Sequence, residues 1–503
     1  MGGITTELIA AIGGAFLLTF AVLICLCRFW KFSTGVDHPD GVRKHQEAPV
    51  IRVGGIALYI AFLAGWLISS FFTGEADSEL AGIPFLILGT LIFLLGFTDD
   101  LFGLSGAIKL AVQIAIGVAA YLAGMRIGII SNPIGEGSID VGGFSLIVTV
   151  LWFVAIPNLV NLVDGLDGLA GGVVLFLSAT LAVLGGMTGD LALLLFGASI
   201  AAGVVAFLCF NLPPARVYMG DGGAYLLGYF IAGSSLVTSN KGSMFGALLV
   251  VVIALGFPIL DTLFAMCRRA ISGLPIMAPD ARHIHHRLMT LGFSKRTILL
   301  VLYGVFAGLC LLGLSVFVTS GYTLPVVGMV VTVGVFLGFR SIGLPHSVRQ
   351  VREALGDIVA ARKDIRYAYN LSQVLEHDIE RSASAEEYWG RVRESLLRLD
   401  ISPASKAPNS EPCGEGRCLI VFPLRNERVW KLCCPEPKEK TTRRQWDRVI
   451  RCFLPALMNG LSRWESLPED LGIEELPKEQ CPELLEEQLN RKIDMNPCGF
   501  THG

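Results

Sequence analysis

Eleven stretches of this chain are apolar for about the length of a membrane-crossing helix. A helix needs roughly 20 mostly apolar residues to span a bilayer. Only 17% of the residues are charged, whereas soluble domains carry about 25%. The sequence therefore predicts an all-α polytopic membrane protein with about eleven transmembrane helices. The expected spans are 5–28, 53–72, 81–98, 107–125, 145–163, 168–187, 191–210, 222–239, 244–266, 297–318 and 322–341.

The basic residues indicate which helix ends face the cytoplasm. No basic segment precedes the first apolar stretch, which favours a retained span with its N-terminus outside over a cleaved signal peptide. The inner loops then contain thirteen Lys and Arg residues, and the outer loops contain only Arg126 and Lys241. Because cytoplasmic loops are enriched in these residues, we expect the C-terminus to lie in the cytoplasm.

The composition changes near residue 342. We divide the chain into a transmembrane catalytic domain (1–341), a small cytoplasmic α/β appendage (342–470) and a flexible acidic tail (471–503). Within the appendage the pattern predicts amphipathic helices over 346–382 and 384–400, the second capped by Ser384. It also predicts paired strands over 417–424 and 427–434 and a helix within 440–463. Turn residues predict a short outer hairpin within 126–143.

Polar residues gather at the inner ends of the predicted spans. In "PNLVNLVDGLDGLAGG" (157–172), Asn158, Asn161, Asp164 and Asp167 recur at every third position after an apolar run. Any one of them could simply cap a helix, but polar residues within a span are costly and usually functional. The same inner ends also carry Asp99, Asp100, Asn211, Asp221, Asp261, His283, His285 and His286.

These residue types favour a hard cation. Several carboxylates without a dense Cys and His cluster suit Mg²⁺ or Mn²⁺, and Mg²⁺ usually binds one or two carboxylates plus substrate phosphates. In "MGDGG", Asp221 opens a helix, where backbone amides attract anions. Arg282 and the histidines of "PDARHIHHRL" could clamp phosphate oxygens. The pattern therefore indicates phosphoryl transfer at the membrane surface, and the nearly balanced net charge of -3 disfavours nucleic-acid binding.

Six ordered blocks of sequence resemble one enzyme family. They are "HQEAPVIRVGGIAL", "FTDDLFGLSGAIKLAVQ", "NLVNLVDGLDGLAGG", "FNLPPARVYMGDGGAYLLG", "GFPILDTLFAMCRR" and "DARHIHHRL", which lie within residues 30–300. The chain resembles the polyprenyl-phosphate N-acetylhexosamine-1-phosphate transferases, in the branch that makes undecaprenyl-diphosphate-GlcNAc.

The resemblance implies a reaction and a location. Undecaprenyl phosphate would attack the β-phosphorus of a UDP-N-acetylhexosamine in the bacterial cytoplasmic (inner) membrane, giving the lipid-diphosphate-sugar and UMP. Mg²⁺ would be required, with Mn²⁺ as a substitute. This step begins the synthesis of cell-surface polysaccharides such as lipopolysaccharide O-antigen or teichoic acid. Family members are often dimers, so a homodimer is expected by analogy.

The resemblance also assigns residues to roles. Asp221 matches a metal ligand, and Asp99 and Asp100 match a paired acidic motif that orients the lipid phosphate or helps to hold the metal. The full set of expected catalytic residues is Asp99, Asp100, Asp164, His285 and His286, with Asp221 and Asp100 at the metal. The expected substrate-binding residues are Arg43, His45, Lys109, Asn161, Asp167, Asn211, Arg282 and His283.

Two departures from the family pattern and three alternative functions stay open at this point. Gly103 stands where the acidic motif often has a third Asp, and "HIHHR" replaces the three consecutive histidines typical of the branch that uses UDP-MurNAc-pentapeptide. The second departure disfavours the pentapeptide donor, which is one alternative. The others are a nucleotide-sugar or lipid-glycan transporter, which would place ionisable groups near the midplane of repeated halves, and an inactive membrane scaffold.

Overall fold

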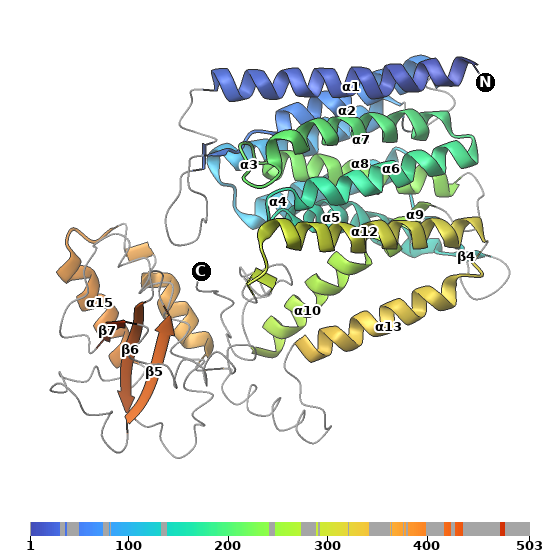
Figure 1. Ribbon diagram of the computed structural model, residues 1–503. Coiled ribbons are helices and arrows are strands. Elements are labelled where there is room, and N and C mark those ends of the chain that lie inside the picture. Colours follow the sequence, from blue (N-terminus) through green and yellow to red (C-terminus); the bar gives the residue numbers. More distant parts are fainter. Residues whose placement is uncertain are drawn as a thin grey trace. The chain divides into compact units, whose positions relative to one another are not determined.

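The computed structural model (Figure 1) forms two compact units, which are described separately. The first comprises Met1–His38, Gln46–Ile259 and Phe293–Gly334, and the second comprises Pro39–His45, Leu260–Gly292 and Val335–Gly503. The structure describes residues 2–30, 36–37, 50–73, 80, 82–131, 138–240, 247–272, 288–289, 292–319, 321–341, most of 363–398, and 417–423, 428–435 and 473–477.

Long helices dominate the first unit, where they run side by side (Figure 1). Their sequences are rich in Leu, Ile, Val, Phe and Ala, and several begin at a side-chain cap, such as Ser105 before α4 and Asp190 before α7. In chain order the helices of this unit are α1 (Gly2–Phe29), α2 (Gly55–Thr73), α3 (Ile83–Phe102), α4 (Gly106–Leu122), α5 (Ser145–Val163), α6 (Leu169–Thr188), α7 (Leu191–Asn211), α8 (Gly220–Asn240), α9 (Ala247–Ala254), α12 (Lys295–Val318) and, as far as Gly334, α13 (Leu324–Ser341). Helix α10 (Gly256–Ser272) begins in this unit and belongs to the second unit from Leu260 onward.

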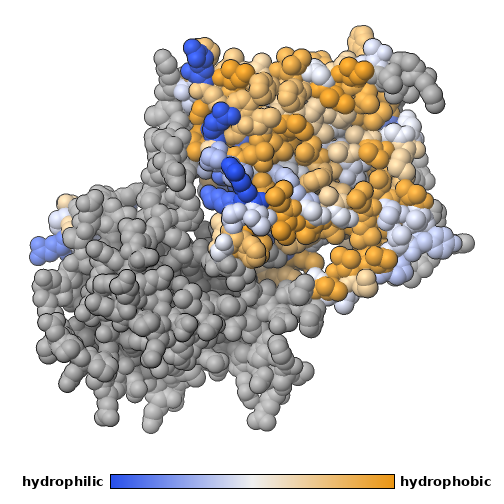
Figure 2. All heavy atoms as spheres, viewed as in Figure 1, coloured by the Kyte–Doolittle hydropathy of each residue, from blue (hydrophilic) through white to orange (hydrophobic). Residues whose placement is uncertain are grey.

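The centre of this bundle consists of α6, α7 and α8. The most apolar windows of α6 and α7 are 72% and 78% buried, whereas those of α1 and α12 are 22% and 33% buried. Large apolar side chains such as Ile9 and Leu300 are exposed on the outer helices. Figure 2 shows this apolar surface over the bundle, with hydrophilic residues gathered towards one end. An apolar surface of this extent requires a nonaqueous surrounding, and the protein is a multi-pass membrane protein.

The expected number of spans is not confirmed. Among the described residues, seven helices are long and apolar enough to cross a membrane, or eight if the bent pair α9 and α10 forms one span. This pair replaces the continuous span expected over 244–266, because the chain bends by 63° between Leu248–Ala254 and Gly256–Cys267. Two other expected spans, 107–125 and 322–341, correspond to apolar helices that are shorter than the seven, at Gly106–Leu122 and Leu324–Val335.

Close helix packing joins α3 to α8. A Cβ atom on Gly96 of α3 would lie 2.5 Å from the backbone carbonyl oxygen of Asp221 in α8, so only glycine allows this approach. The segment before α2 is held against the same region, because Tyr218 donates its N–H to the carbonyl oxygen of Ile51 over 2.7 Å. The N–H of Gly54 in turn donates to the carbonyl oxygen of Tyr218 over 3.0 Å. Three segments distant in sequence therefore meet where α8 begins.

Outside the helices, the expected hairpin is present. Strands β3 (Ile129–Ser131) and β4 (Ser138–Asp140) pair antiparallel, with Ile130 opposite Ile139. A second short antiparallel pair, β1 (Val36–Asp37) with β2 (Val50–Ile51), precedes α2.

The second unit contains a helix and a small sheet from the predicted appendage. Helix α15 (Ala385–Leu397) begins at Ser384, whose Oγ accepts the N–H of Glu387 over 3.2 Å. Strands β5 (Arg417–Pro423) and β6 (Arg428–Pro435) pair antiparallel, and β7 (Ile473–Pro477) adds to β6. Strand β7 is the described part of the segment 471–503, for which the sequence predicts a flexible acidic tail, and this prediction stays untested. The expected helix within 440–463 lies outside the described residues, and the appendage as a complete α/β domain is not confirmed.

Candidate functional site

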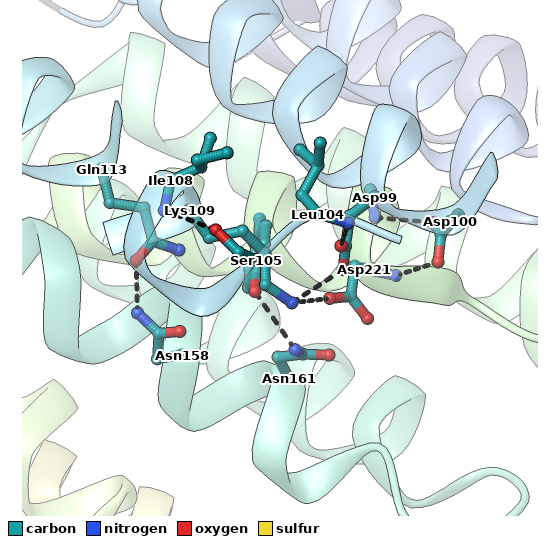
Figure 3. A network of polar contacts seen from close by, with 12 residues as sticks. Asp99, Asp100, Leu104, Ser105, Ile108, Lys109, Gln113, Asn158, Asn161 and Asp221 are labelled. Atoms are coloured by element: carbon teal, nitrogen blue, oxygen red, sulfur yellow. Dashed lines mark hydrogen bonds and ion pairs between the residues drawn. The ribbon is translucent and has the colours of Figure 1, made fainter. Parts of the chain in front are cut away.

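Five charged residues form one cluster at the ends of α3, α4 and α8. Figure 3 shows its three aspartates and its lysine. We call Arg52, Asp99, Asp100, Lys109 and Asp221 the carboxylate–cation cluster. The last turn of α3 contributes the two adjacent aspartates, the first turns of α4 and α8 contribute the lysine and the third aspartate, and the arginine precedes α2. The three carboxylates are at most 10% exposed. Buried carboxylates require charged or hydrogen-bonding partners, and each one has them here.

Asp100 caps the N-terminus of α8. Its Oδ1 accepts the N–H of Asp221 over 2.9 Å, and its Oδ2 accepts the N–H of Gly222 over 3.0 Å. The Nε of Arg52 lies 3.2 Å from Oδ1. Carboxylates stabilise helix N-termini because the first N–H groups have no partner within the helix. Both oxygens of Asp100 therefore hold the start of α8. The catalytic and metal-binding roles expected for Asp100 stay predictions.

Asp99 and Asp221 share the ammonium group of Lys109. Its Nζ lies 2.8 Å from Oδ2 of Asp99 and 3.4 Å from Oδ2 of Asp221 (Figure 3). The other oxygen of Asp99 accepts the N–H of Leu104 over 2.6 Å. The α3 helix ends at Gly103, whose φ of 67° is left-handed. The position where the family motif often has a third Asp is therefore the C-cap that turns the chain towards α4.

Arg52 belongs to the cluster but is not among the site residues that the sequence pattern predicts. Its Nη2 lies 3.3 Å from Oδ1 of Asp221, so its guanidinium bridges Asp221 and Asp100. A Cβ atom on Gly220, at φ 71°, would lie 2.6 Å from the Arg52 carbonyl oxygen. Arg52 lies in the "IRVGG" segment, which could have drawn attention to this residue. The local sequence pattern, however, does not indicate which distant helix this segment contacts.

The carboxamides of α5 point to two different neighbours. The Nδ2 of Asn158 donates to Oε1 of Gln113 over 2.7 Å, and the Nδ2 of Asn161 donates to the Tyr225 hydroxyl over 3.5 Å (Figure 3). Gln113 lies one helical turn after Lys109 on α4, and Tyr225 one turn after Asp221 on α8. Asn161 thus extends the polar region around the cluster, while Asn158 joins α5 to α4.

The loop between α5 and α6 is anchored at several points. Asp167 accepts the N–H of Ala215 over 3.4 Å. The Oδ1 of Asn211 accepts the N–H of Gly168 over 2.9 Å, and its Nδ2 donates to the carbonyl oxygen of Val217. Asn211 is 2% exposed. Its amide therefore fixes this loop against the segment before α8. The substrate-binding role expected for Asn211 stays a prediction.

Asp164 lies directly after α5 and has an unusual electrostatic environment. It keeps some solvent exposure. Burial, followed by the negative charge of Asp221, nevertheless raises the pKa of its carboxyl group to about 8. A carboxyl group with such a pKa is adapted to a neighbouring cation or to proton transfer. Asp164 thus differs from the aspartates that are already paired with Arg52 or Lys109.

The other expected site residues lie outside the described residues. Arg43, His45, Arg282, His283, His285 and His286 belong to this group. Asp261 lies in α10 and forms part of the second unit. The described residues contain no group of three or more His, Cys, Asp or Glu side chains arranged to hold a metal ion.

Comparison with known proteins identifies the family. Residues 83–239, from α3 into α8, match the model described as glycosyl transferase family 4. The Bacillus subtilis (strain 168) protein named probable undecaprenyl-phosphate N-acetylglucosaminyl 1-phosphate transferase is 35% identical over 288 residues, which cover 57% of this chain and 79% of that protein. The chain belongs to the polyprenyl-phosphate N-acetylhexosamine-1-phosphate transferase family.

Other family members support the assignment. The undecaprenyl-phosphate alpha-N-acetylglucosaminyl 1-phosphate transferase of Thermotoga maritima is 32% identical over 299 residues, covering 59% of this chain and 88% of that protein. The protein of the same name from Escherichia coli (strain K12) is 27% identical over 298 residues, covering 58% and 78%. The protein is therefore a transferase, in preference to the transporter and scaffold alternatives.

Proposed function

We propose that this transferase moves N-acetylglucosamine 1-phosphate from UDP-N-acetylglucosamine to undecaprenyl phosphate. The products are UMP and undecaprenyl-diphosphate-N-acetylglucosamine, which begins a cell-surface polysaccharide. The observation that carries the proposal is the convergence of Asp99 and Asp221, from different helices, on the single cation of Lys109. The names of the relatives indicate the lipid acceptor and the GlcNAc group.

The cluster fits a divalent cation. The Lys109 ammonium already occupies a position between two carboxylates and stands in for a positive ion there. Asp221 and Asp99 would hold Mg²⁺, or Mn²⁺ in its place, together with substrate phosphate oxygens. When bound, the ion supplies neutralisation of the negative charge on the diphosphate. Asp100 is less suited to coordination because both of its oxygens accept backbone N–H groups of α8.

The chain's own residues would position two anions for an in-line displacement. An oxygen of the lipid phosphate attacks the β-phosphorus, and the bond from that phosphorus to the oxygen bridging the two phosphates breaks. UMP leaves with the electron pair, and the bond between sugar C1 and its oxygen stays intact. The second pKa of a phosphate monoester is about 6, so the attacking oxygen is already ionised at neutral pH. Positioning and charge neutralisation therefore supply most of the catalysis.

Arg52 and Lys109 have distinct parts in this scheme. Arg52 bridges Asp100 and Asp221 and keeps the carboxylate of Asp221 oriented at the start of α8. Lys109 offers a mobile positive charge to a phosphate oxygen. We further propose that the site faces the cytoplasm. The phosphate-binding roles expected for His283, His285 and His286 stay predictions, because these residues lie outside the described part of the chain.

Product analysis with purified protein tests the function. The detergent-solubilised enzyme is incubated with undecaprenyl phosphate, MgCl₂ and one of several donors, including UDP-GlcNAc, UDP-GalNAc and UDP-MurNAc-pentapeptide. Nucleotide products are separated chromatographically, and lipid products are identified by mass spectrometry. The proposal predicts UMP and a lipid-diphosphate-GlcNAc, with no turnover in excess EDTA. Release of UDP, or turnover only with the pentapeptide donor, would contradict it.

A further inference from the structure

Asp221 has a cation on each of its carboxylate oxygens. The Nη2 of Arg52 lies 3.3 Å from Oδ1, and the Nζ of Lys109 lies 3.4 Å from Oδ2. Lys109 also lies 2.8 Å from Oδ2 of Asp99. Any divalent cation that binds both aspartates must therefore approach oxygens that already face a positive charge.

The two cations differ in how easily they can withdraw. The Arg52 guanidinium contacts Asp100 and Asp221 through separate nitrogens, and its backbone is adjacent to Ile51, which accepts the N–H of Tyr218. A planar guanidinium with two contacts is held in one orientation. Lys109 instead presents a single ammonium at the end of a flexible four-carbon stem, although its side chain is less exposed (24%) than that of Arg52 (42%). Lys109 can therefore turn towards solvent or a ligand without disturbing α4.

The position of the Lys109 ammonium is the one that a shared ion would need. It lies within ion-pair distance of both Asp99 and Asp221, and an ammonium and a divalent cation cannot occupy the same space or share the same oxygens without strong repulsion. Arg52, by contrast, approaches Asp221 from its other oxygen. Of the two cations that contact Asp221 in the described part of the chain, Lys109 is therefore the one that competes with a shared ion.

We propose that Lys109 is an exchangeable counter-ion of the metal site. Without substrate, its ammonium neutralises Asp99 and Asp221 and weakens the binding of a divalent cation. An arriving diphosphate offers the ammonium a new anionic partner, so Lys109 moves to a phosphate oxygen and the cation takes its place. Metal and nucleotide sugar consequently strengthen each other's binding, because a coupling of this kind is reciprocal. This inference rests on the proposed function for the identity of the phosphate ligand.

Binding of Mn²⁺ measured by electron paramagnetic resonance tests the exchange directly. The purified protein in detergent is titrated with Mn²⁺, with and without UDP-GlcNAc, and a protein-free sample corrects for binding by the nucleotide itself. For the wild type we expect weak binding that becomes at least about tenfold tighter with UDP-GlcNAc. For Lys109→Gln we expect nucleotide-free binding to tighten about tenfold, and the effect of the nucleotide to shrink.

Two further variants separate charge competition from general effects. Lys109→Arg keeps the positive charge and should bind Mn²⁺ as weakly as the wild type. Lys295→Gln removes a lysine at the start of α12, for which no ion pair is found among the described residues, and should leave Mn²⁺ binding unchanged. Size-exclusion profiles and melting temperatures confirm that each variant is folded.

The outcomes distinguish this inference from the proposed function. If folded Lys109→Gln binds Mn²⁺ no more tightly than the wild type, or if neither binds it, the exchange is overturned. If Lys109→Gln binds more tightly while the wild type releases no UMP from any donor, the exchange stands and the proposed reaction fails.

Discussion

The hydroxyl group of Tyr303 in α12 donates a hydrogen bond to the carbonyl oxygen of Gly168 over 2.6 Å. The N–H of the same glycine donates to Asn211 over 2.9 Å. The backbone of Gly168, at the end of the loop between α5 and α6, is thus held through both its N–H and its carbonyl oxygen by helices that are distant in sequence. Because Asp164 and Asp167 precede this glycine, Tyr303 fixes a part of the candidate site without belonging to it.

Removing this hydroxyl should reduce turnover more than stability. A neutral hydrogen bond contributes about 1 kcal/mol, so Tyr303→Phe should lower the melting temperature by only a few degrees. We expect kcat for UMP release to fall about three- to tenfold, because the loop loses one of its anchors. Tyr322→Phe is the matched control, since Tyr322 is 89% exposed. Equal kinetics for both variants would show that the anchor does not matter for catalysis.

Gly220 should tolerate a side chain much less than Gly103. Both have positive φ, at 71° and 67°. A Cβ atom on Gly220 would lie 2.5 Å from Oδ2 of Asp100 and 2.6 Å from the Arg52 carbonyl oxygen, whereas nothing lies within 4 Å of one on Gly103. Backbone strain alone costs about 1 kcal/mol. Gly103→Ala should therefore be mildly destabilising, and Gly220→Ala should destabilise by about 3 kcal/mol or more.

Chemical denaturation of both glycine variants in mixed micelles provides this comparison. Equal losses of stability would mean that the start of α8 adjusts around Arg52 and Asp100. A larger loss in Gly220→Ala, accompanied by loss of UMP release, would support the tight packing of the carboxylate–cation cluster.

Neutralising Asp164 should stabilise the metal-free protein at high pH. The folded protein raises the pKa of this carboxyl group from 3.8 to about 8, so the folded state binds its proton more tightly than the unfolded state. Its contribution to stability is therefore full below pH 4 and is lost as the pH rises towards 8. Asp164→Asn avoids this loss, and its melting temperature in EDTA should exceed that of the wild type increasingly over this range.

The expected difference is on the order of 5 °C at pH 8 and close to zero at pH 4. Differential scanning fluorimetry in detergent at a series of pH values measures it, with Asp140→Asn as a control at an exposed aspartate in β4. A pH-independent difference would show that Asp164 is not selectively protonated in the folded protein.

Asp100 and Asp221 should respond differently to replacement by asparagine. Asp100 accepts two backbone N–H groups of α8, and losing its charge should destabilise the helix start by about 1–2 kcal/mol. Asp221→Asn removes a metal-binding oxygen in the proposed scheme and should abolish UMP release while the protein stays folded. Melting temperatures and UMP release are compared for both. Normal turnover in Asp221→Asn would exclude this residue from the mechanism.

Local sequence pattern predicted the helices well but not how they meet. The expected span 145–163 coincides with α5, and Ser384 caps α15, because apolar runs and caps are properties of neighbouring residues. The span over 244–266 is instead the bent pair α9 and α10. Hydropathy averages over a window and does not register a bend between two apolar helices.

The roles within the site depended on contacts between distant segments. The sequence pattern predicts that Asp99, Asp100 and Asp221 lie at inner helix ends. Because Asp99 and Asp100 are adjacent in the chain, this pattern does not distinguish their roles. Only the packing of α3 on α8 shows that Asp100 caps α8 while Asp99 pairs with Lys109. The bridge made by Arg52 likewise depends on a pairing with the segment before α8, which no local periodicity reveals.

Locating the divalent cation tests the central claim most directly. Crystals of the enzyme grown with Mn²⁺ and UDP-GlcNAc, and measured at the manganese absorption edge, give the ion's position from anomalous scattering. We expect one peak about 2.1 Å from an oxygen of Asp221, within reach of Asp99, with the Lys109 ammonium withdrawn. A peak away from Asp221, or one at Asp221 with Lys109 still between the two aspartates, would contradict this account.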